Sequence, residues 1–259
     1  MTTVLDAKLC GRRLPLQVGS RGSVLALVQT RTVLARLRAL FPTSPAEDLF
    51  QEHPIRTTGD AVQHRTLAGI GGKGLFAKEI HEALSDGRID LAVHSLKDLE
   101  THLPAGIVLG CVLDREDARD ALVIAGDGTI DPSAPFAALP AHAVVGTASV
   151  RRQAQLLHAR PDLRIVPLRG NVDTRLTKLR GGACDATVLA LAGLRRLGLQ
   201  DRASAVLDPD VMVPAAGQGI IGVTVRESDA ALRELLALID DPASRAAATA
   251  ERAVLAALD

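Results

Sequence analysis

The sequence predicts an α/β protein with two domains. Short apolar stretches alternate with longer amphipathic ones, which is the pattern of strands and helices that follow one another along a chain. The chain has 259 residues, of which 47% are hydrophobic and 23% charged. This length allows a large core and two domains of about 100 to 150 residues each. Because the chain has four Phe and neither Trp nor Tyr, we expect an aliphatic core.

The predicted elements follow in a regular order. The apolar stretches predicted as strands are 14–20, 48–58, 89–95, 106–114, 121–126, 143–149, 163–171 and 186–194. The amphipathic stretches predicted as helices are 23–41, 74–87, 150–160, 172–182, 231–240 and 243–258. Gly87 is a stop signal for the second helix, and a short helix follows the strand that ends at Leu194. Three prolines in 127–142 indicate a connecting segment between the predicted strands 121–126 and 143–149. The stretch 211–226, which contains PAAGQG, precedes the last two helices.

Composition excludes several classes of protein. The net charge is zero, so no global field attracts nucleic acid or an anionic membrane, and too few aromatics are present for base stacking. A steep salt dependence of binding would be needed to favour a nucleic-acid or phosphate binder. No apolar stretch reaches the ~18 residues of a membrane span, and the segment after Arg12 and Arg13 is too polar for a signal peptide. We therefore expect a cytoplasmic protein.

The three cysteines, Cys10, Cys111 and Cys184, lie far apart and show no CxxC spacing. This arrangement predicts neither a metal site nor a disulfide framework, and it fits a reducing compartment. Cys111 lies in a strand-like stretch and Cys184 just before a buried one, so we interpret both as small hydrophobic residues.

Cations stand where several predicted helices begin. They are Arg21, Lys73, Lys78, Arg151, Arg152, Arg169 and Arg175. A cation at a helix N-terminus is unfavourable by roughly 0.3–1 kcal/mol, whereas the free backbone N–H groups there favour anions. We interpret the set as one site for a polyanionic ligand, and Arg suits carboxylates because its planar group binds both oxygens. For any single residue, a solvated cation near a helix start is the alternative.

The stretch LAVHSLKD (91–98) takes an apolar strand directly into titratable residues. The carboxyl end of such a strand lies at the edge of the sheet where ligands usually bind. Asp98, one acid among many bases, is therefore a candidate for proton transfer or for stabilising a cation. A surface ion pair of Lys97 with Asp98 is the alternative, and we interpret His94 as a packed strand histidine rather than a catalyst.

The motifs resemble one family closely, the porphobilinogen deaminases, also called hydroxymethylbilane synthases. The matching segments are SRGSVLAL, IRTTGD, IGGKGLFAKEI, IDLAVHSLKDL, REDARDALV, GTASVRRQAQL, LRGNVDTRLTKL, LAGLRRLGL and PAAGQGIIGV, in the order of the family. The resemblance implies a cytoplasmic, monomeric transferase of tetrapyrrole biosynthesis, the source of haem and chlorophyll. It joins four porphobilinogen molecules head to tail with loss of ammonia, and water then releases hydroxymethylbilane. Neither nucleic acid nor membrane is an implied partner.

The resemblance also implies roles for single residues. Asp98 would contact pyrrole N–H groups and stabilise the positive azafulvene that forms when ammonia leaves. Lys97 would assist it and hold carboxylate. The carboxylates of substrate and cofactor would be bound by Arg21, Ser23, Lys73, Lys78, Ser95, Thr147, Ser149, Arg151, Arg152, Arg169, Arg175, Arg196 and Gln218. The segment 60–69 matches a mobile lid.

The implied fold resembles type II periplasmic binding proteins, in which two domains flank a cleft. Domain 1 would comprise 13–119 plus 220–237, and domain 2 would comprise 125–213. The family carries a third domain whose cysteine binds a dipyrromethane cofactor, and 242–259 would be its remnant. We expect that cysteine to fall beyond Asp259, with no other cysteine replacing it, so that the chain as given would be a fragment with impaired turnover. A non-catalytic receptor for polycarboxylate pyrroles or other dicarboxylates is the alternative, although a pure anion receptor gains nothing from Asp98.

Overall fold

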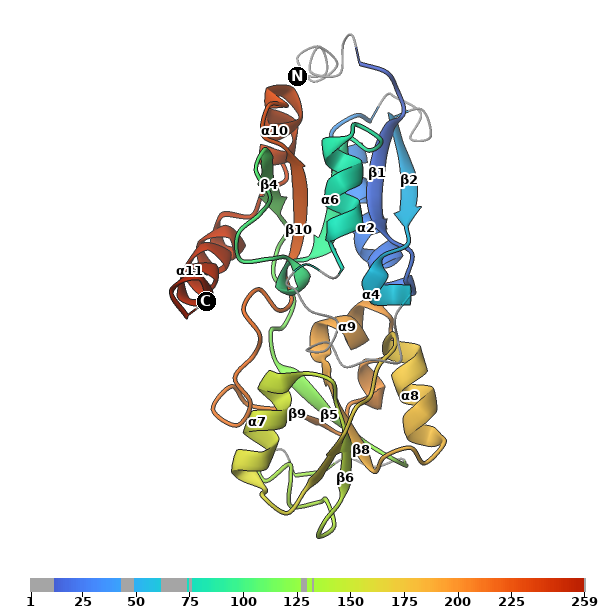
Figure 1. Cartoon of the computed structure of the whole chain (residues 1–259), viewed down its shortest axis with the longest axis vertical. Coiled ribbons are helices and arrows are strands. Elements are labelled where there is room, and N and C mark those ends of the chain that lie inside the picture. The colour runs from blue at the N-terminus through green and yellow to red at the C-terminus, as the bar shows by residue number, and fades with distance from the viewer. Residues whose placement is uncertain are drawn as a thin grey trace. The chain divides into compact units, whose positions relative to one another are not determined.

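The computed structural model describes residues 12–42, 49–61, 74, 76–126, 130–131 and 133–258. The chain divides into two compact units. Unit 1 contains the described residues of Met1–Ala61, Lys73–Arg115 and Ile220–Asp259, and unit 2 contains those of Glu116–Gly219. The chain therefore enters unit 1, forms unit 2 and returns to unit 1 (Figure 1).

Unit 1 is built on a five-stranded sheet with the order β2-β1-β3-β10-β4. Its strands are β1 (Leu16–Arg21), β2 (Phe50–Ile55), β3 (Leu91–Ser95), β4 (Ile107–Val112) and β10 (Ile221–Arg226). β1 runs parallel to β2 and β3, whereas β10 is antiparallel to both β3 and β4. The carboxyl ends of β1 and β3 therefore lie at the same edge of the sheet.

Helices cover this sheet. They are α2 (Val24–Arg38), α4 (Thr58–Ala61), α6 (Lys78–Ser85), α10 (Ala230–Ala237) and α11 (Pro242–Leu258), with a 3₁₀ turn, η1 (Leu96–Asp98), after β3. α2 and α6 pack on β1 and β3, and α10 packs on β4 (Figure 1). The core between them is aliphatic apart from Phe41, Phe50 and Cys111, in agreement with the composition.

Unit 2 is built on a second five-stranded sheet, with the order β7-β6-β8-β5-β9. Its strands are β5 (Asp120–Ile124), β6 (Val144–Gly146), β7 (Arg164–Val166), β8 (Ala186–Ala190) and β9 (Ala205–Val206). The helices are α7 (Val150–Ala159), α8 (Val172–Arg180), α9 (Leu191–Arg196) and the 3₁₀ turn η2 (Gln200–Arg202). β6 is parallel to β7 and β8, so α7 and α8 both begin at the carboxyl edge of this sheet.

The predicted α/β fold is confirmed, with two mixed sheets and helices packed on them. Several predicted strands are shorter than expected, and two of them end for a clear physical reason. β7 ends at Val166 because Pro167 has no N–H to continue the ladder. β8 ends at Ala190, and Leu191 and Leu194 are buried on the helix α9 rather than on a strand. An apolar run alone does not distinguish these two states.

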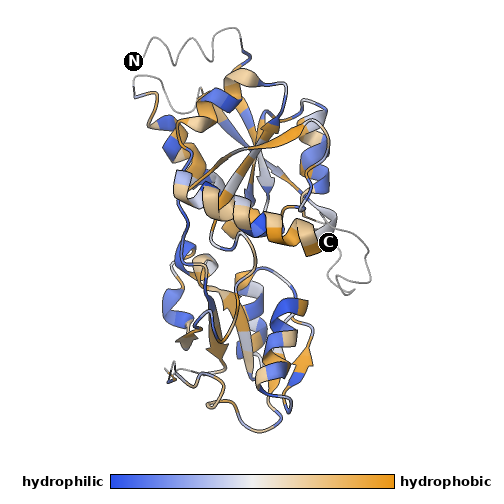
Figure 2. Ribbon diagram, turned by 90° about the vertical axis from the view of Figure 1, so that its left-hand side faces the viewer, coloured by the Kyte–Doolittle hydropathy of each residue, from blue (hydrophilic) through white to orange (hydrophobic). Residues whose placement is uncertain are grey.

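The helix α11 is largely apolar in composition but little buried. Figure 2 shows much of it in orange, up to the C-terminus, whereas Ser244 and Ala248 are its buried residues. Val254 and Leu258 are exposed. Arg252 of this helix donates to the carbonyls of Glu100 and Thr101, which fixes α11 on unit 1. In the described part of the chain, no helix combines the length and apolarity that a membrane crossing requires.

Candidate active site

The carboxyl edge of the unit 1 sheet brings Arg21 and Asp98 together. Arg21 is the last residue of β1, and Asp98 ends the 3₁₀ turn that follows β3. Leu96, which begins this turn, and Leu99, which follows it, are buried, so Lys97 and Asp98 between them face outward. Arg21 Nη1 lies 3.8 Å from Asp98 Oδ2. The parallel pairing of β1 with β3 thus places the candidate carboxylate beside a guanidinium.

A ring contact also fixes Arg21. Its guanidinium lies over the Phe76 ring, 4.2 Å from the ring centroid. Such cation–π contacts contribute about 0.5–1 kcal/mol at exposed sites. The aromatic ring and the Asp98 carboxylate together hold the guanidinium at the sheet edge. The sequence did not predict the contact of Arg21 with the ring.

Two serines of the predicted site have structural partners. Ser23 is the N-cap of α2, and its Oγ accepts from Ala26 N at 3.3 Å. Ser95 Oγ lies 2.8 Å from Gln29 Nε2 and 3.1 Å from Gln29 Oε1, so the buried Gln29 fixes the end of β3.

The structure describes Lys78 among the predicted site lysines of the segment IGGKGLFAKEI. Lys78 begins α6, is 74% exposed and lies 4.0 Å from Glu82. Lys73 and residues 62–69 of the predicted lid (60–69) lie outside the described residues.

In unit 2, the N-terminus of α7 brings Thr147, Ser149, Arg151 and Arg152 together. Ser149 is the N-cap, and its Oγ accepts from Arg152 N at 3.4 Å. Thr147 Oγ1 accepts from Ser149 N at 3.2 Å, which orders the chain before the helix. The first-turn arginines of this helix are thus held on a capped, well-defined N-terminus, where anions bind favourably.

A buried carboxylate, Asp120, supplies the counter-ion for these arginines. Arg151 Nη2 donates to Asp120 Oδ2 and Arg152 Nη2 to Asp120 Oδ1, each at 2.7 Å. Burial opposes ionisation of Asp120, but the charges and hydrogen bonds of Arg152 and Arg151 outweigh it and lower the pKa of the carboxyl below its usual value. Sequence reasoning missed Asp120, although two cations in the first turn of a helix that has no acid there should have indicated an internal anion.

The N-terminus of α8 carries the next pair of predicted residues. Asn171 is its N-cap, and Oδ1 accepts from Thr174 N at 2.8 Å. Gly170 has a φ of 119°, a conformation that favours glycine and turns the chain between Arg169 and the cap. Arg175 Nε donates to Gly170 O at 2.8 Å. This turn therefore places Arg169 and Arg175 close to the N-terminus of one helix.

Arg196 ends the helix α9, and Gln218 lies on the segment through which the chain returns to unit 1. Arg196 Nη2 donates to Gly219 O at 2.6 Å. Gln218 is fully buried, and its Nε2 donates to Ala118 O at 2.6 Å and to Asp120 Oδ1 at 2.9 Å. These contacts are with the protein itself, and the role of both residues toward a ligand stays a prediction.

His94 is a packed strand histidine, as predicted. Its imidazole is buried and lies 3.0 Å from Thr224 Oγ1, with Nε2 making this contact. Burial, with a smaller contribution from His81, lowers its pKa to about 3. The His81 ring is 5.4 Å away, and His81 Nδ1 lies 3.7 Å from Glu100 Oε2. His81, His94 and Thr224 are buried, so this cluster belongs to the interior of unit 1.

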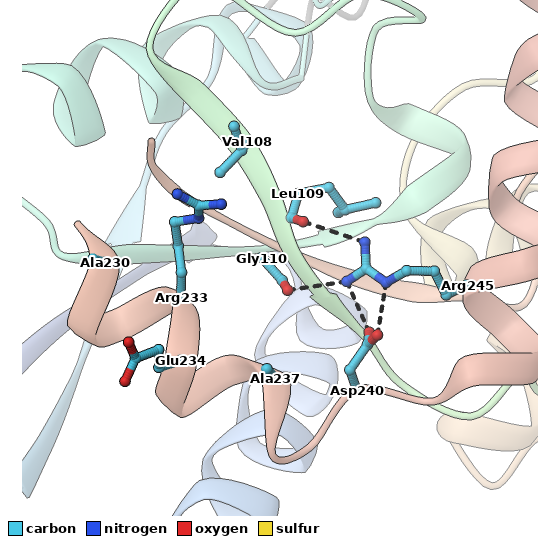
Figure 3. A pocket seen from close by; sticks show the side chains of 9 residues that line it. All are labelled: Val108, Leu109, Gly110, Ala230, Arg233, Glu234, Ala237, Asp240 and Arg245. Carbon is cyan, nitrogen blue, oxygen red and sulfur yellow. Dashed lines mark hydrogen bonds and ion pairs between the residues drawn. The ribbon is translucent and has the colours of Figure 1, made fainter. Parts of the chain in front are cut away.

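A pocket lies elsewhere in unit 1, along the edge strand β4 (Figure 3). It measures about 500 Å³ and is flanked by α10 and the start of α11. Arg245 donates to Asp240 through two nitrogens and to the carbonyls of Leu109 and Gly110. These contacts satisfy backbone groups at the outer edge of β4, a protection that open sheet edges need. None of the predicted site residues that the structure describes lines this pocket.

Metal binding is not indicated in the part of the chain that the structure describes. No group of three or more His, Cys, Asp or Glu side chains is arranged to hold an ion there. Cys111 and Cys184 are buried free cysteines, as predicted, and Cys10 lies outside the described residues.

Comparisons with known proteins identify the family. The family profile described as porphobilinogen deaminase, dipyromethane cofactor binding domain, matches residues 16–234. The chain is 52% identical to porphobilinogen deaminase of Roseiflexus castenholzii over 93% of this chain and 76% of that relative. It is 51% identical to porphobilinogen deaminase of Paracoccus denitrificans over 95% of this chain and 76% of that relative. The chain belongs to the porphobilinogen deaminase family.

Membership in this family confirms the resemblance that the motifs indicated. The chain is also similar to a chloroplastic porphobilinogen deaminase of Oryza sativa, with 46% identity over 94% of this chain and 66% of that relative. The matched region carries the family's cofactor-binding domain, in agreement with the expected dipyrromethane cofactor. The alternative of a non-catalytic receptor is not favoured by these relatives.

Solved structures resemble the chain only weakly. A periplasmic substrate-binding protein of an ABC transporter from Coxiella burnetii has a TM-score of 0.46 and 16% identity, covering 90% of this chain and 95% of that one. The periplasmic molybdate-binding protein of Azotobacter vinelandii has a TM-score of 0.44 and 12% identity, covering 91% and 97%. At these scores no property of the chain follows from the likeness.

Proposed function

We propose that this chain is a hydroxymethylbilane synthase, a transferase that condenses four porphobilinogen molecules head to tail. One observation carries the proposal: the family profile spans both units, and the relatives that share about half of the residues are porphobilinogen deaminases. We also propose that it acts as a cytoplasmic monomer, as the family resemblance implies.

The reaction requires stabilisation of a cation and positioning of a nucleophile. In each step the aminomethyl C–N bond breaks, ammonia leaves, and the pyrrole nitrogen supplies electrons to form a positively charged azafulvene. The free α-carbon of the pyrrole at the end of the growing chain then attacks this azafulvene, and a C–C bond forms with loss of a proton. We assign both tasks to Asp98, because its carboxylate can accept from pyrrole N–H and stabilise the positive charge. Arg21, 3.8 Å away, orients it.

The substrates explain the cations of a chain whose net charge is zero. Each pyrrole carries an acetate and a propionate, so a growing chain accumulates carboxylates. In unit 2 the N-termini of α7 and α8 provide backbone N–H groups together with Arg151, Arg169 and Arg175. Guanidinium groups bind carboxylates through two parallel hydrogen bonds, which fixes position as well as charge. Thr147 and Ser149 assist at the first of these termini.

The same donors fit the family's dipyrromethane cofactor, which is itself a polycarboxylate pyrrole. Arg151, Arg169 and Arg175 would hold its carboxylates, with Ser149 beside them. When bound, the cofactor supplies the end to which the first pyrrole is joined. Within the described residues, the chemistry of the donor set in unit 2 suits this group because cations there lie at capped helix N-termini.

Mass spectrometry of the complex tests the proposal. The purified chain is incubated with porphobilinogen, and its mass is measured under non-denaturing conditions. We expect complexes in which each added unit has the mass of porphobilinogen minus one ammonia. Asp98→Ala should bind porphobilinogen that still carries its ammonia. Asp86→Ala, which removes an exposed acid at the end of α6, serves as the matched control. Absence of any bound pyrrole at millimolar porphobilinogen would contradict the proposal.

A further inference from the structure

Asp120 is a fully buried carboxylate for which neither the motifs nor the proposed chemistry assigns a role. It begins β5, where its backbone pairs with Ala190 of β8. Leu207 N donates to its carbonyl at 2.8 Å, so the main chain of this residue is fixed on both sides. A carboxylate without solvent in such a place requires strong partners, because burial of an unpaired charge is very unfavourable.

Three side chains supply these partners. Arg152 binds Oδ1 and Arg151 binds Oδ2, and Gln218 adds a hydrogen bond to Oδ1. Each carboxylate oxygen therefore accepts from a different guanidinium, and the two arginines are neighbours in α7. The separations along the chain are 32 and 31 residues for the arginines and 98 for the glutamine. Asp120 thus joins the start of α7 to the segment on which the chain leaves unit 2.

The two arginines differ in what they present to solvent. Arg152 is 5% exposed and also donates to Val188 O at 2.8 Å, so its guanidinium belongs to the interior. The Arg151 side chain is 25% exposed and also contacts Val213 O. These two contacts use both Nη atoms of Arg151, and each Nη carries a second N–H group. The partly exposed guanidinium can therefore donate to a ligand while it remains anchored.

The charges of this cluster also favour an anionic ligand. Two guanidinium groups and one carboxylate give a net positive charge at the N-terminus of α7, where the helix dipole adds to it. Asp120 neutralises the interior charge of Arg152, and the surplus positive charge lies at the more exposed Arg151. A pyrrole carboxylate at Arg151 would complete the neutralisation.

We propose that Asp120 is a positioning residue, which anchors Arg151 so that its guanidinium meets a pyrrole carboxylate in a fixed orientation at the N-terminus of α7. This inference rests on the proposed function, because it takes the ligand to be porphobilinogen or a chain of pyrroles. It assigns direct ligand contact to Arg151 and an internal, supporting role to Arg152. Pre-organisation of this kind raises affinity, since the ligand need not order the arginine itself.

Two other roles for Asp120 predict different results. If the carboxylate were only structural, its loss would lower the melting temperature and leave affinity for porphobilinogen unchanged in the folded protein. If it acted mainly as a negative charge near an anion site, its removal would tighten binding, because the local charge would become more positive. Positioning predicts weaker binding in a protein that is still folded.

The test is calorimetric titration of porphobilinogen into the wild-type chain, Asp120→Asn and Arg151→Gln, and into the double variant. Circular dichroism at the titration temperature confirms that each is folded. We expect Asp120→Asn to bind about tenfold or more weakly, the loss typical of one charge-assisted hydrogen bond. In the wild-type chain, Arg151→Gln should weaken porphobilinogen binding by a similar factor. In the Asp120→Asn background, it should weaken binding by less than about a further twofold, because an unanchored Arg151 contributes little. Additive losses, unchanged affinity or tighter binding would each overturn the proposal.

Control variants distinguish a failure of folding, of the positioning role and of the proposed function. Asp162→Asn removes a carboxylate that pairs with Arg160 at the other end of α7, and it should leave affinity unchanged. If Asp120→Asn does not fold, Asp120→Asn combined with Arg152→Met removes the buried cation that would otherwise lack a partner. Wild-type affinity in that variant would overturn the proposal as well. If the wild-type chain binds no porphobilinogen, the proposed function fails; if it binds and Asp120→Asn binds equally, only the positioning role fails.

Discussion

Replacing His94 by glutamine should make the stability of the chain less sensitive to acid. The His94 imidazole is 7% exposed, and its contacts are Thr224 of β10 and the His81 ring of α6, beside which lies Glu100. Burial, together with the neighbouring His81, lowers the pKa of His94 to about 3. The folded protein therefore keeps this side chain neutral at pH values where an exposed histidine is charged.

The sign and size of the effect follow from linkage. In the unfolded chain the pKa of a histidine is about 6.5. Between pH 6.5 and pH 3 the unfolded chain binds a proton that the folded chain does not, so stability falls as pH falls through this range. A folded-state pKa of about 3 gives a loss of about 2 kcal/mol between pH 7 and pH 5 from this one residue. Well above pH 6.5 the histidine is neutral in both states, so it has no effect on the pH dependence there.

Urea unfolding followed by circular dichroism at pH 7, 6 and 5 measures this loss. The free energy of unfolding of His94→Gln should fall by about 2 kcal/mol less than that of wild type over this range. His158→Gln, at an exposed position near the end of α7, should show the wild-type slope. If His94→Gln and wild type lose stability in parallel from pH 7 to pH 5, the argument from burial is refuted.

Three further predictions concern the site and the cores. Asp98→Ala should abolish elongation of the pyrrole chain, whereas Asp98→Glu should retain part of it; porphobilinogen consumption at the wild-type rate in the alanine variant would remove Asp98 from the mechanism. Gly146→Ala should destabilise the protein by about 1–3 kcal/mol in thermal unfolding, because its Cβ would lie 2.9 Å from Leu168 Cδ2. Gly181→Ala, whose Cβ would meet nothing closer than 3.4 Å, should change stability far less, and equal losses would contradict the packing argument. Burial, with a smaller contribution from a nearby aspartate, raises the pKa of the Cys111 thiol to about 12, so it should resist alkylation at pH 8 until urea unfolds the chain; rapid labelling of native protein would show that it is accessible.

The order of elements could be predicted because each sheet strand is a short apolar run and each helix an amphipathic one. The turn that carries Asp98 was also accessible, since LAVHSLKD places titratable residues directly after a buried strand. Strand ends were less predictable. Pro167 ended β7 through a missing donor, and the apolar residues after Ala190 are buried in a helix instead of a strand. Periodicity over so few residues does not separate these outcomes.

The partners of the predicted site residues could not be read from the sequence. The ligand argument treated the arginines at the start of α7 as needing an external anion, but Asp120 supplies an internal one. This contact joins residues more than 30 positions apart and depends on the pairing of β5 with β8. Likewise, the cation–π contact of Arg21 with Phe76 has no local sequence signal. Residue types at helix starts indicate the chemistry of a site, whereas the tertiary fold decides which of them remain available to a ligand.

The central claim is that the cations of this chain bind the carboxylates of porphobilinogen. Calorimetric titration with porphobilinogen and with its dimethyl ester, in which both carboxylates are blocked, tests it most directly. We expect saturable binding of the free acid and binding at least about tenfold weaker for the diester, because each lost ion pair with a guanidinium removes a charge-assisted hydrogen bond. Equal affinity for the two compounds would contradict the account, since the arginines would then play no part in recognition.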